Sequence, residues 1–210
     1  MEFLRNLKTK KVIRTAGLMT GTSMDGLDIS IADIGLSNNT ADFNIIGMTS
    51  IPFPSDLKSK VRQAVYDTGK NSSELDQDLG KWYAEKLSDY LISESIHNIE
   101  LIGSHGQTIH HVSGQSTLQI GNPSFLAEKF NIPVISDFRT ADIRAGGTGA
   151  PLMPRVDEWL FRNIDTAIIT LNLGGVANVT FLPCVNNGDV IGFDTGPGMA
   201  LLDETFLQES

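Results

Sequence analysis

The stretch that most constrains the fold is Gly17–Asp28, a polar segment with apolar residues on both sides. The flanking apolar residues predict two short strands, and the glycine-bearing middle from 20 to 26 predicts a β-hairpin turn. Gly21 and Gly26 allow the backbone of this turn to approach a ligand closely. The segment therefore predicts a hairpin whose bend carries functional side chains.

The chemistry of this bend suits phosphate. Consecutive backbone N–H groups, with the hydroxyls of Thr22 and Ser23, are able to surround phosphate oxygens, and Asp25 or Asp28 fits beside a Mg²⁺ ion that neutralises them. No Gly-Lys-Ser/Thr sequence closes the loop and no helix is predicted after it, which excludes a Walker A loop. A strand-turn-strand phosphate loop indicates instead the fold of actin, hexokinase and the heat-shock ATPases. The alternative is an ordinary Gly/Ser/Thr turn.

Composition narrows the class of protein. The chain has 210 residues, 40% of them hydrophobic, which suffices for the core of one large domain or one and a fraction. A net charge of −9 argues against general nucleic-acid binding. Cys184 is the single cysteine, so a disulfide framework is excluded and a cytoplasmic location is predicted. No apolar run is long enough to span a bilayer, so we expect no membrane partner.

Strand and helix patterns alternate along the chain, which predicts an α/β fold. Trp82 and Tyr83 fall in register with leucines of one helix and are predicted to be core residues. After the first hairpin, the pattern predicts strands over 42–52, 99–103, 117–121 and 133–136, and helices over 54–69, 72–91, 122–130 and 154–162.

The segment Ser104–His111 is predicted to be the loop that leaves the carboxyl end of the strand 99–103. Ligands collect at this edge of open α/β sheets. His105, His110 and His111 suggest a metal, but no cysteine or acidic residue lies at ligand spacing from them. Hydrogen bonding to a polar substrate, or to the loop itself, is therefore the favoured role.

A second candidate loop runs from Asp137 to Leu152 and is dense in glycine. We expect it to be functional, because closely spaced glycines imply backbone that approaches another group. The alternative is an exposed connector in which Asp137 and Asp142 pair with Arg139 and Arg144.

The pattern of the first hairpin returns near the end of the chain. Residues 167–173 and 176–182 predict two strands joined by Gly174 and Gly175, a loose echo of the first bend. Asp194 is predicted at the exit of the next strand, before a Gly-Pro-Gly turn and the positive end of a helix. A carboxylate placed there can act as a general base, and the alternative is a helix-capping aspartate.

Together these motifs resemble the anhydro-N-acetylmuramic acid kinases of bacterial cell-wall recycling. The resemblance runs in order through most of the chain. It is carried by the segments Gly17–Asp28, Ile102–Ile109, Leu118–Pro123, Asp137–Arg139 with Asp142, Ala145–Leu152, Leu171–Asn178 and Gly192–Gly198.

The resemblance implies an actin-like ATPase (ribonuclease H-like) α/β fold with two domains that close over a cleft. It also implies a reaction that needs ATP and Mg²⁺. Water opens the bridge of 1,6-anhydro-N-acetylmuramic acid and the freed O6 takes the γ-phosphoryl group, which gives N-acetylmuramic acid 6-phosphate and ADP. The aspartate that activates the water in this family matches Asp194.

The resemblance also implies the binding residues. The first bend holds the nucleotide phosphates through Gly21, Thr22, Ser23, Met24, Asp25, Gly26, Leu27 and Asp28, with Asp25 near the metal through water. Gly174, Gly175 and Asn178 form the opposing phosphate loop. The sugar candidates are Ser104, His105, Gly106, Thr108, Asn122 and Arg139, with the Arg139 guanidinium on the lactyl carboxylate.

Chains of this family are much longer than this one. We therefore expect residues 1–163 to form the first α/β domain and residues 164–210 to begin the second, whose remaining part is missing. The resemblance implies a homodimer for the full-length protein, and the fragment alone is expected to be inactive. The alternative is a non-catalytic nucleotide- or sugar-binding module derived from the kinase. A kinase for another hexose is disfavoured, because its base would deprotonate a sugar hydroxyl rather than water.

Overall fold

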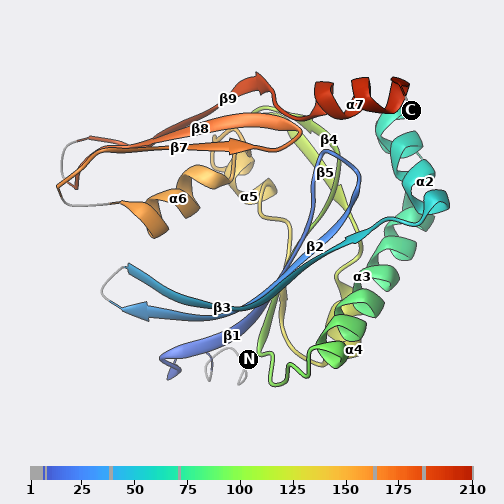
Figure 1. Ribbon diagram of the computed structural model, residues 1–210, viewed down its shortest axis with the longest axis horizontal. Helices are drawn as coiled ribbons and strands as arrows, with labels where there is room; N and C mark the ends of the chain where they lie inside the picture. The colour runs from blue at the N-terminus through green and yellow to red at the C-terminus, as the bar shows by residue number, and fades with distance from the viewer. Residues whose placement is uncertain are drawn as a thin grey trace.

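The structure is a computed structural model that describes residues 7, 9–37, 40–70, 72–162, 165–185 and 188–209. It contains two β-sheets with helices beside them, a mixed α/β architecture as predicted (Figure 1). The predicted boundary between residues 163 and 164 lies outside the described residues. Among the described helices, none combines the length and the apolar character that crossing a membrane requires.

The first sheet is mixed and has the strand order β3-β2-β1-β4-β5, with β6 paired to β4. Neighbouring strands β1, β2 and β3 are antiparallel, whereas β4 runs parallel to β1. The predicted hairpin and the predicted third strand are both confirmed. The strands are β1 (Val12–Thr20), β2 (Gly26–Ser37), β3 (Thr40–Pro52), β4 (Leu101–Val112), β5 (Ser116–Ile120) and β6 (Val134–Ile135).

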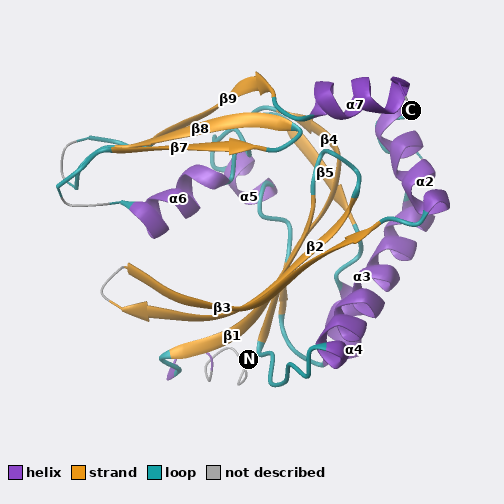
Figure 2. Ribbon diagram, viewed as in Figure 1, coloured by secondary structure: helices purple, strands orange, loops and turns teal. Residues whose placement is uncertain are grey.

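Three helices cover one face of this sheet: α2 (Ser55–Tyr66), α3 (Ser73–Ser93) and α4 (Ser124–Phe130) (Figure 2). Their apolar residues pack against the inward-facing residues of β1, β2 and β4 and form the main core. The predicted core roles of Trp82 and Tyr83 are confirmed, because Tyr83 is buried and Trp82 packs on Phe53 with ring centroids 5.1 Å apart. The Tyr83 hydroxyl lies 3.1 Å from Thr20 Oγ1, so this pair joins α3 to the end of β1.

The prediction that a strand ends at Gly103 was wrong. Strand β4 continues through Ser104–His111 to Val112 and pairs with β5 along its second half. Gly106 has φ +74°, and a side chain there would come within 2.7 Å of the Ile120 carbonyl oxygen. A glycine in this conformation bends the strand and interrupts the alternation of its side chains. The local sequence pattern of Ser104–His111 therefore predicts a loop.

The second sheet is a three-stranded antiparallel meander, with the order β7-β8-β9. It repeats the arrangement of β1, β2 and β3, so the predicted second hairpin is confirmed. Its strands are β7 (Ile168–Leu173), β8 (Val176–Leu182) and β9 (Ile191–Pro197), and the helix α7 (Ala200–Glu209) follows. Asp194 lies inside β9 rather than at the exit of the strand, which corrects the predicted position.

Helix α6 (Met153–Phe161) packs on one face of the second sheet and also contacts β3 of the first sheet (Figure 1). Asp157 of this helix is buried and accepts hydrogen bonds from Thr170 Oγ1 on β7 (2.6 Å) and Thr180 Oγ1 on β8 (2.7 Å). A buried carboxylate requires such donors, because its desolvation is costly. Asp157 therefore fixes the helix that lies between the two sheets.

The opposite face of the second sheet is apolar and exposed. Cross-strand partners form two rows on this face, Ile169–Phe181–Ile191 and Leu171–Val179–Phe193. Ile169 is 71% exposed and Leu171 59%. No described helix lies on this side of the sheet (Figure 2). A contiguous apolar face of this kind marks a surface that packs against further polypeptide.

Candidate active site

The bends of the two hairpins lie against each other. A methyl group added at Gly175, in the β7–β8 bend, would lie 2.7 Å from Thr22 Oγ1 and 3.5 Å from the Ser23 backbone nitrogen in the β1–β2 bend. The two predicted phosphate loops, far apart in the sequence, are thus neighbours in space.

The first bend is a tight turn in which the Met24 amide donates to the Gly21 carbonyl (3.2 Å). Gln107 of β4 holds the same carbonyl through its side-chain amide (3.1 Å). Ser23 Oγ donates to Asp25 Oδ1 (2.8 Å), so hydroxyl and carboxylate are adjacent. Thr22 is exposed and Met24 has φ +53°, a conformation that is uncommon outside glycine.

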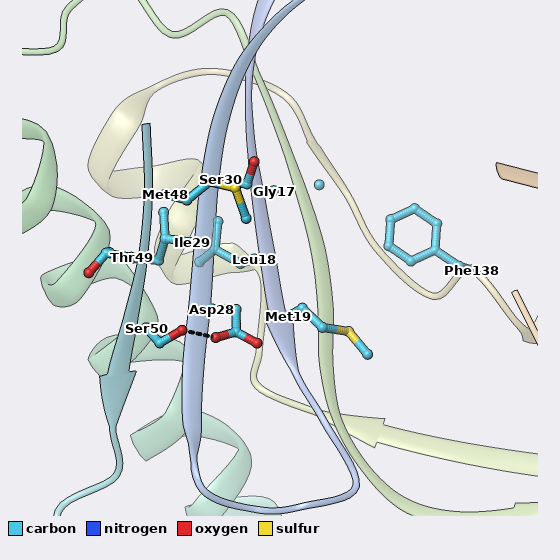
Figure 3. Close-up of a pocket in the computed structure, with 11 residues that line it drawn as sticks. Gly17, Leu18, Met19, Asp28, Ile29, Ser30, Met48, Thr49, Ser50 and Phe138 are labelled. Atoms are coloured by element: carbon cyan, nitrogen blue, oxygen red, sulfur yellow. Dashed lines mark hydrogen bonds between the residues drawn. The ribbon is translucent and has the colours of Figure 1, made fainter. Parts of the chain in front are cut away.

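Asp28 lies apart from the bend, inside β2. It faces an open cavity of about 660 Å³ on the side of the first sheet that α2 and α3 do not cover (Figure 3). Its carboxylate accepts a hydrogen bond from the Ser50 hydroxyl, and Met19, Met48 and Phe138 give the cavity an apolar lining. These contacts separate Asp28 chemically from the polar bend, where we predicted a role beside phosphate.

The second bend is joined to the start of α7. The amides of Gly198 and Met199 donate to the carbonyls of Gly175 (3.0 Å) and Gly174 (2.8 Å). These two amides are therefore engaged within the protein. The positive helix end that we predict beside Asp194 therefore does not offer these two amides to a ligand.

Asp194 belongs to a polar row across the second sheet, because Asn172 pairs with Asn178 and Asn178 with Asp194. The Asp194 side chain is exposed. It acts electrostatically on two residues that precede it in the chain, Arg139 and His111. Burial lowers the pKa of Arg139, and the Asp194 charge opposes this effect. An acid and a guanidinium from different parts of the chain thus interact electrostatically.

Arg139 precedes the short helix α5 (Thr140–Arg144) and is held by several partners. Its Nε and Nη2 donate to His105 Nε2 at 3.1 and 3.0 Å, and its Nη1 donates to the Gly149 carbonyl at 2.8 Å. His105 Nδ1 lies 2.8 Å from the Gly106 carbonyl, so this nitrogen carries the proton and Nε2 is the acceptor. Burial lowers the pKa of His105, and the nearby Arg139 charge adds to this effect.

His111 lies on the same side of the site and was not among the predicted binding residues. Its Nδ1 is 3.2 Å from Thr117 Oγ1, while Nε2 is buried and has no hydrogen-bond partner in the described structure. Burial lowers the pKa of His111, Arg139 acts in the same direction and Asp194 in the opposite one. The local sequence identified His111 only as one of three histidines in Ser104–His111, whereas its neighbours here belong to β5 and to residues beyond β6.

The predicted sugar-binding residues are divided between two places. Ser104, His105 and Gly106 line a polar cavity of about 250 Å³ with Asp137 and Thr140, and the buried Ser104 hydroxyl lacks a partner there. Thr108 Oγ1 accepts a hydrogen bond from Gln119 (3.4 Å) on β5. Asn122 lies at the start of α4, where its Oδ1 accepts from the Ser124 amide (3.0 Å). Their roles toward a sugar stay predictions.

The glycine-dense loop folds back onto its own helix. The Gly147 and Gly149 amides donate to the Asp142 backbone carbonyl (2.9 Å) and to Asp142 Oδ2 (2.8 Å). Asp137 Oδ1 accepts from the Thr140 amide (3.1 Å), which together with the Thr140 hydroxyl lowers the pKa of Asp137. The two aspartates therefore bind backbone amides rather than forming the arginine pairs of the alternative interpretation.

The acidic and histidine side chains of the described residues form no group of three or more that could hold a metal ion by themselves. The carboxylate nearest to the two bends is that of Asp25, which already accepts from Ser23. A Mg²⁺ ion that binds mainly to nucleotide phosphates needs only one or two protein carboxylates. The bend fits that limited role.

The fold and the site define a mixed α/β protein in which two strand-turn-strand bends meet. A family model described as anhydro-N-acetylmuramic acid kinase matches residues 13–210, so the chain belongs to this family.

Relatives in two Bacillus species carry the same description. The chain is 40% identical over 201 residues to "Anhydro-N-acetylmuramic acid kinase" of a Bacillus cereus strain, an alignment that covers 90% of this chain and 53% of the relative. It is 40% identical over 205 residues to the protein of the same description from Bacillus thuringiensis (strain Al Hakam), covering 92% of this chain and 53% of that relative. The chain thus spans about half the length of the curated relatives it matches.

Proposed function

We propose that this chain carries the phosphate loops and the catalytic aspartate of an ATP- and Mg²⁺-dependent kinase. The kinase hydrolyses the bridge of 1,6-anhydro-N-acetylmuramic acid and phosphorylates O6, giving N-acetylmuramic acid 6-phosphate and ADP. The observation that carries the proposal is the electrostatic interaction of Asp194 with Arg139 and His111, on the sheet whose bend touches the first bend. The space between Asp194 and Arg139 is the proposed substrate cleft. Family membership adds the substrate class.

The two bends are the proposed site for the nucleotide phosphates. Gly175 lies against Thr22 and Ser23, and this contact supports the proposal. The proposed site takes residues 21–28 from the first bend and Gly174, Gly175 and Asn178 from the second. Asp25 is the proposed metal contact, through water. When bound, Mg²⁺ offsets the charge that develops on the transferred phosphoryl group. Asp28 is proposed only as a support of the bend, because Ser50 holds its carboxylate.

Asp194 is proposed as the general base. Its carboxylate accepts a proton from water as the water oxygen bonds to the anomeric carbon of the sugar. The C1–O6 bond breaks, and O6 bonds to the γ-phosphorus as the bond to ADP breaks. Asn172 and Asn178, its neighbours in the same cross-strand row, are placed to hydrogen-bond the water or the sugar.

Arg139 is the proposed partner of the lactyl carboxylate, because its guanidinium lies in the cleft near Asp194. Ser104 is proposed to contact the sugar as well, since its buried hydroxyl has no partner and lines the polar cavity. Gly106, Thr108 and Asn122 belong to the same proposal, and His105 belongs to it through its hydrogen bonds to Arg139. Of these, His105 and Asn122 already use side-chain atoms for contacts within the protein.

We also propose an actin-like ATPase fold, with a first domain over 1–163 and the start of a second over 164–210. The repeated three-stranded meander supports a duplicated architecture. The exposed apolar rows Ile169–Phe181–Ile191 and Leu171–Val179–Phe193 support further elements that pack on the second sheet. A cytoplasmic homodimer is part of the same proposal. On this basis the 210 residues bind sugar without turnover.

The second candidate is a non-catalytic binding module derived from the kinase. It is favoured by the exposed apolar face of the second sheet, because such a face is typical of a surface that binds a partner. Both candidates predict ligand binding, but only the kinase predicts turnover once the chain is extended to the length of its relatives.

Calorimetric titration with 1,6-anhydro-N-acetylmuramic acid and with ATP·Mg²⁺, followed by an assay of ADP release, separates the two candidates. The measurements compare this chain with the same chain extended by the C-terminal half of the Bacillus cereus relative. We expect sugar binding by both and ADP release by the extended protein alone. Asp194→Asn in the extended protein should abolish release and keep sugar binding. ADP release by the Asp194→Asn variant would refute the role of Asp194. A further reaction run in ¹⁸O-labelled water would exclude an ordinary hexose kinase if the label appeared in the C1 hydroxyl of the product.

A further inference from the structure

We propose that His105 and Asp142 are positioning residues that fix the Arg139 guanidinium in the cleft from two sides. Hydrogen bonds connect them in one chain: His105 accepts from Arg139, Arg139 donates to the Gly149 carbonyl, and the Gly149 amide donates to Asp142. The inference rests on the proposed function only for the ligand that Arg139 binds.

The bonds of Arg139 determine what it can offer to a ligand. A guanidinium has five N–H groups. Three of them are used by the protein, two on His105 Nε2 and one on the Gly149 carbonyl. The two remaining N–H groups are one on Nη1 and one on Nη2. A carboxylate needs two such donors for a bidentate contact. Because the other edge of the group is held, the side chain loses little freedom when the ligand binds.

His105 has no atom left for a ligand. The residue is 7% exposed, its Nδ1 donates to the Gly106 carbonyl and its Nε2 accepts from Arg139. This pattern is possible only for a neutral imidazole with the proton on Nδ1. His105 therefore acts on the substrate through Arg139, which differs from the direct contact that the sequence motif suggests.

Asp142 fixes the other side through the backbone. Its Oδ2 accepts from the Gly149 amide, and this turns the Gly149 carbonyl toward Arg139 Nη1 (2.8 Å). Gly149 has φ +73°, and a side chain there would come within 2.8 Å of Ile143 and 3.2 Å of His111. The glycines of this loop thus allow the backbone to close around Asp142 and present a carbonyl to Arg139.

Matched pairs of variants test the inference. His105→Gln and Asp142→Asn leave a side-chain acceptor at each position, whereas His105→Leu and Asp142→Leu remove it. His97→Leu is the control, because the His97 side chain is exposed. The hydrogen bond described between His97 and Arg14 uses the backbone carbonyl of His97, which the substitution leaves in place. The first readout needs no substrate: ¹⁵N NMR of the four histidines and of the Arg139 Nε–H group in the full chain.

We expect a His105 signal with the proton on Nδ1, and an Arg139 Nε–H signal that exchanges slowly. His105→Leu should shift the Arg139 signal and speed its exchange, Asp142→Leu should shift it through Gly149, and the acceptor-keeping variants should restore most of the wild-type behaviour. A His105 ring protonated on Nε2, or an Arg139 signal unchanged in both leucine variants, would overturn the inference.

The second readout is calorimetric binding of 1,6-anhydro-N-acetylmuramic acid. The leucine variants should weaken it by about tenfold to a hundredfold, the range expected for losing hydrogen bonds to a charged group, and the Gln and Asn variants by much less. Equal losses in the leucine and the acceptor-keeping variants would contradict positioning. If the wild-type chain does not bind the sugar, the proposed function of the chain fails, while the NMR result still decides whether Arg139 is held in this way.

Discussion

Asp157 gives the sharpest prediction about stability. This buried carboxylate joins α6 to the second sheet through the hydroxyls of Thr170 (2.6 Å) and Thr180 (2.7 Å). In Asp157→Ala both hydroxyls lose their acceptor, and Thr180 is fully buried. An unsatisfied buried polar group costs about 1–3 kcal/mol, so Thr180 should lower the free energy of unfolding by about this amount, and the half-buried Thr170 should add less.

Urea denaturation measures this loss. The chain has two tryptophans, and in a Trp82→Phe background Trp159 on α6 is the sole tryptophan and reports directly on this helix. The Asp157→Ala variant should shift the midpoint with little change in the denaturant slope. The triple variant Asp157→Leu, Thr170→Val, Thr180→Val should recover much of the loss, because replacing all partners by apolar groups leaves none unsatisfied.

A loss below about 0.5 kcal/mol for Asp157→Ala would be close to that of an ordinary surface substitution and would refute this reasoning. A triple variant as unstable as the alanine variant would contradict it in a second way, since the cost would then not come from unsatisfied hydroxyls.

Three further predictions concern the core, the second bend and pH. Tyr83→Phe removes the partner of the buried Thr20 hydroxyl, so urea denaturation should show a free energy of unfolding lower by about 1 kcal/mol. An unchanged midpoint would show that this hydrogen bond does not stabilise the fold. Gly198→Ala places a methyl group against the Gly174 carbonyl and should therefore distort the second bend. In calorimetry this variant should bind ATP·Mg²⁺ more weakly, with a smaller loss of sugar binding. A larger loss of sugar binding would contradict a phosphate-binding role of this bend. Burial lowers the pKa of His105, so below pH of about 6.5 the unfolded chain binds a proton that the folded chain excludes. The melting temperature of the chain should therefore fall from pH 7 to pH 5, and it should fall less steeply in the His105→Gln variant. An equal pH dependence of the melting temperature in the wild-type chain and the variant would contradict this.

The sequence predicted the elements whose signals are local. The two hairpins, the third strand and the helices around Trp82 and Tyr83 follow from alternation, helical spacing and turn glycines, and the structure has them. The prediction of a loop at Ser104–His111 was wrong, because the strand continues there and the bulge at Gly106 interrupts the alternation of its side chains. Local patterns do not distinguish a bulged strand from a loop.

The composition of the candidate site was predictable, but its contacts were not. Glycine density between 137 and 152 correctly indicated close backbone approach, yet the group approached is Asp142 of the adjacent helix. The bonds between Arg139 and His105 join residues 34 positions apart, and His111 enters the site through the same long-range packing. Such juxtapositions depend on how β4 and β6 pair, which no single segment reveals.

The central claim is that the sugar binds in the cleft where Asp194 faces Arg139. The most direct test is an NMR titration of the ¹⁵N-labelled chain with 1,6-anhydro-N-acetylmuramic acid, following the Asp194 amide and the Arg139 side chain, with the Ile169 amide on the outer face as the control. The account predicts that the Asp194 and Arg139 signals shift together, along one saturating curve, while the Ile169 signal does not move. Shifts confined to one side of the cleft, or to the outer face, would contradict it.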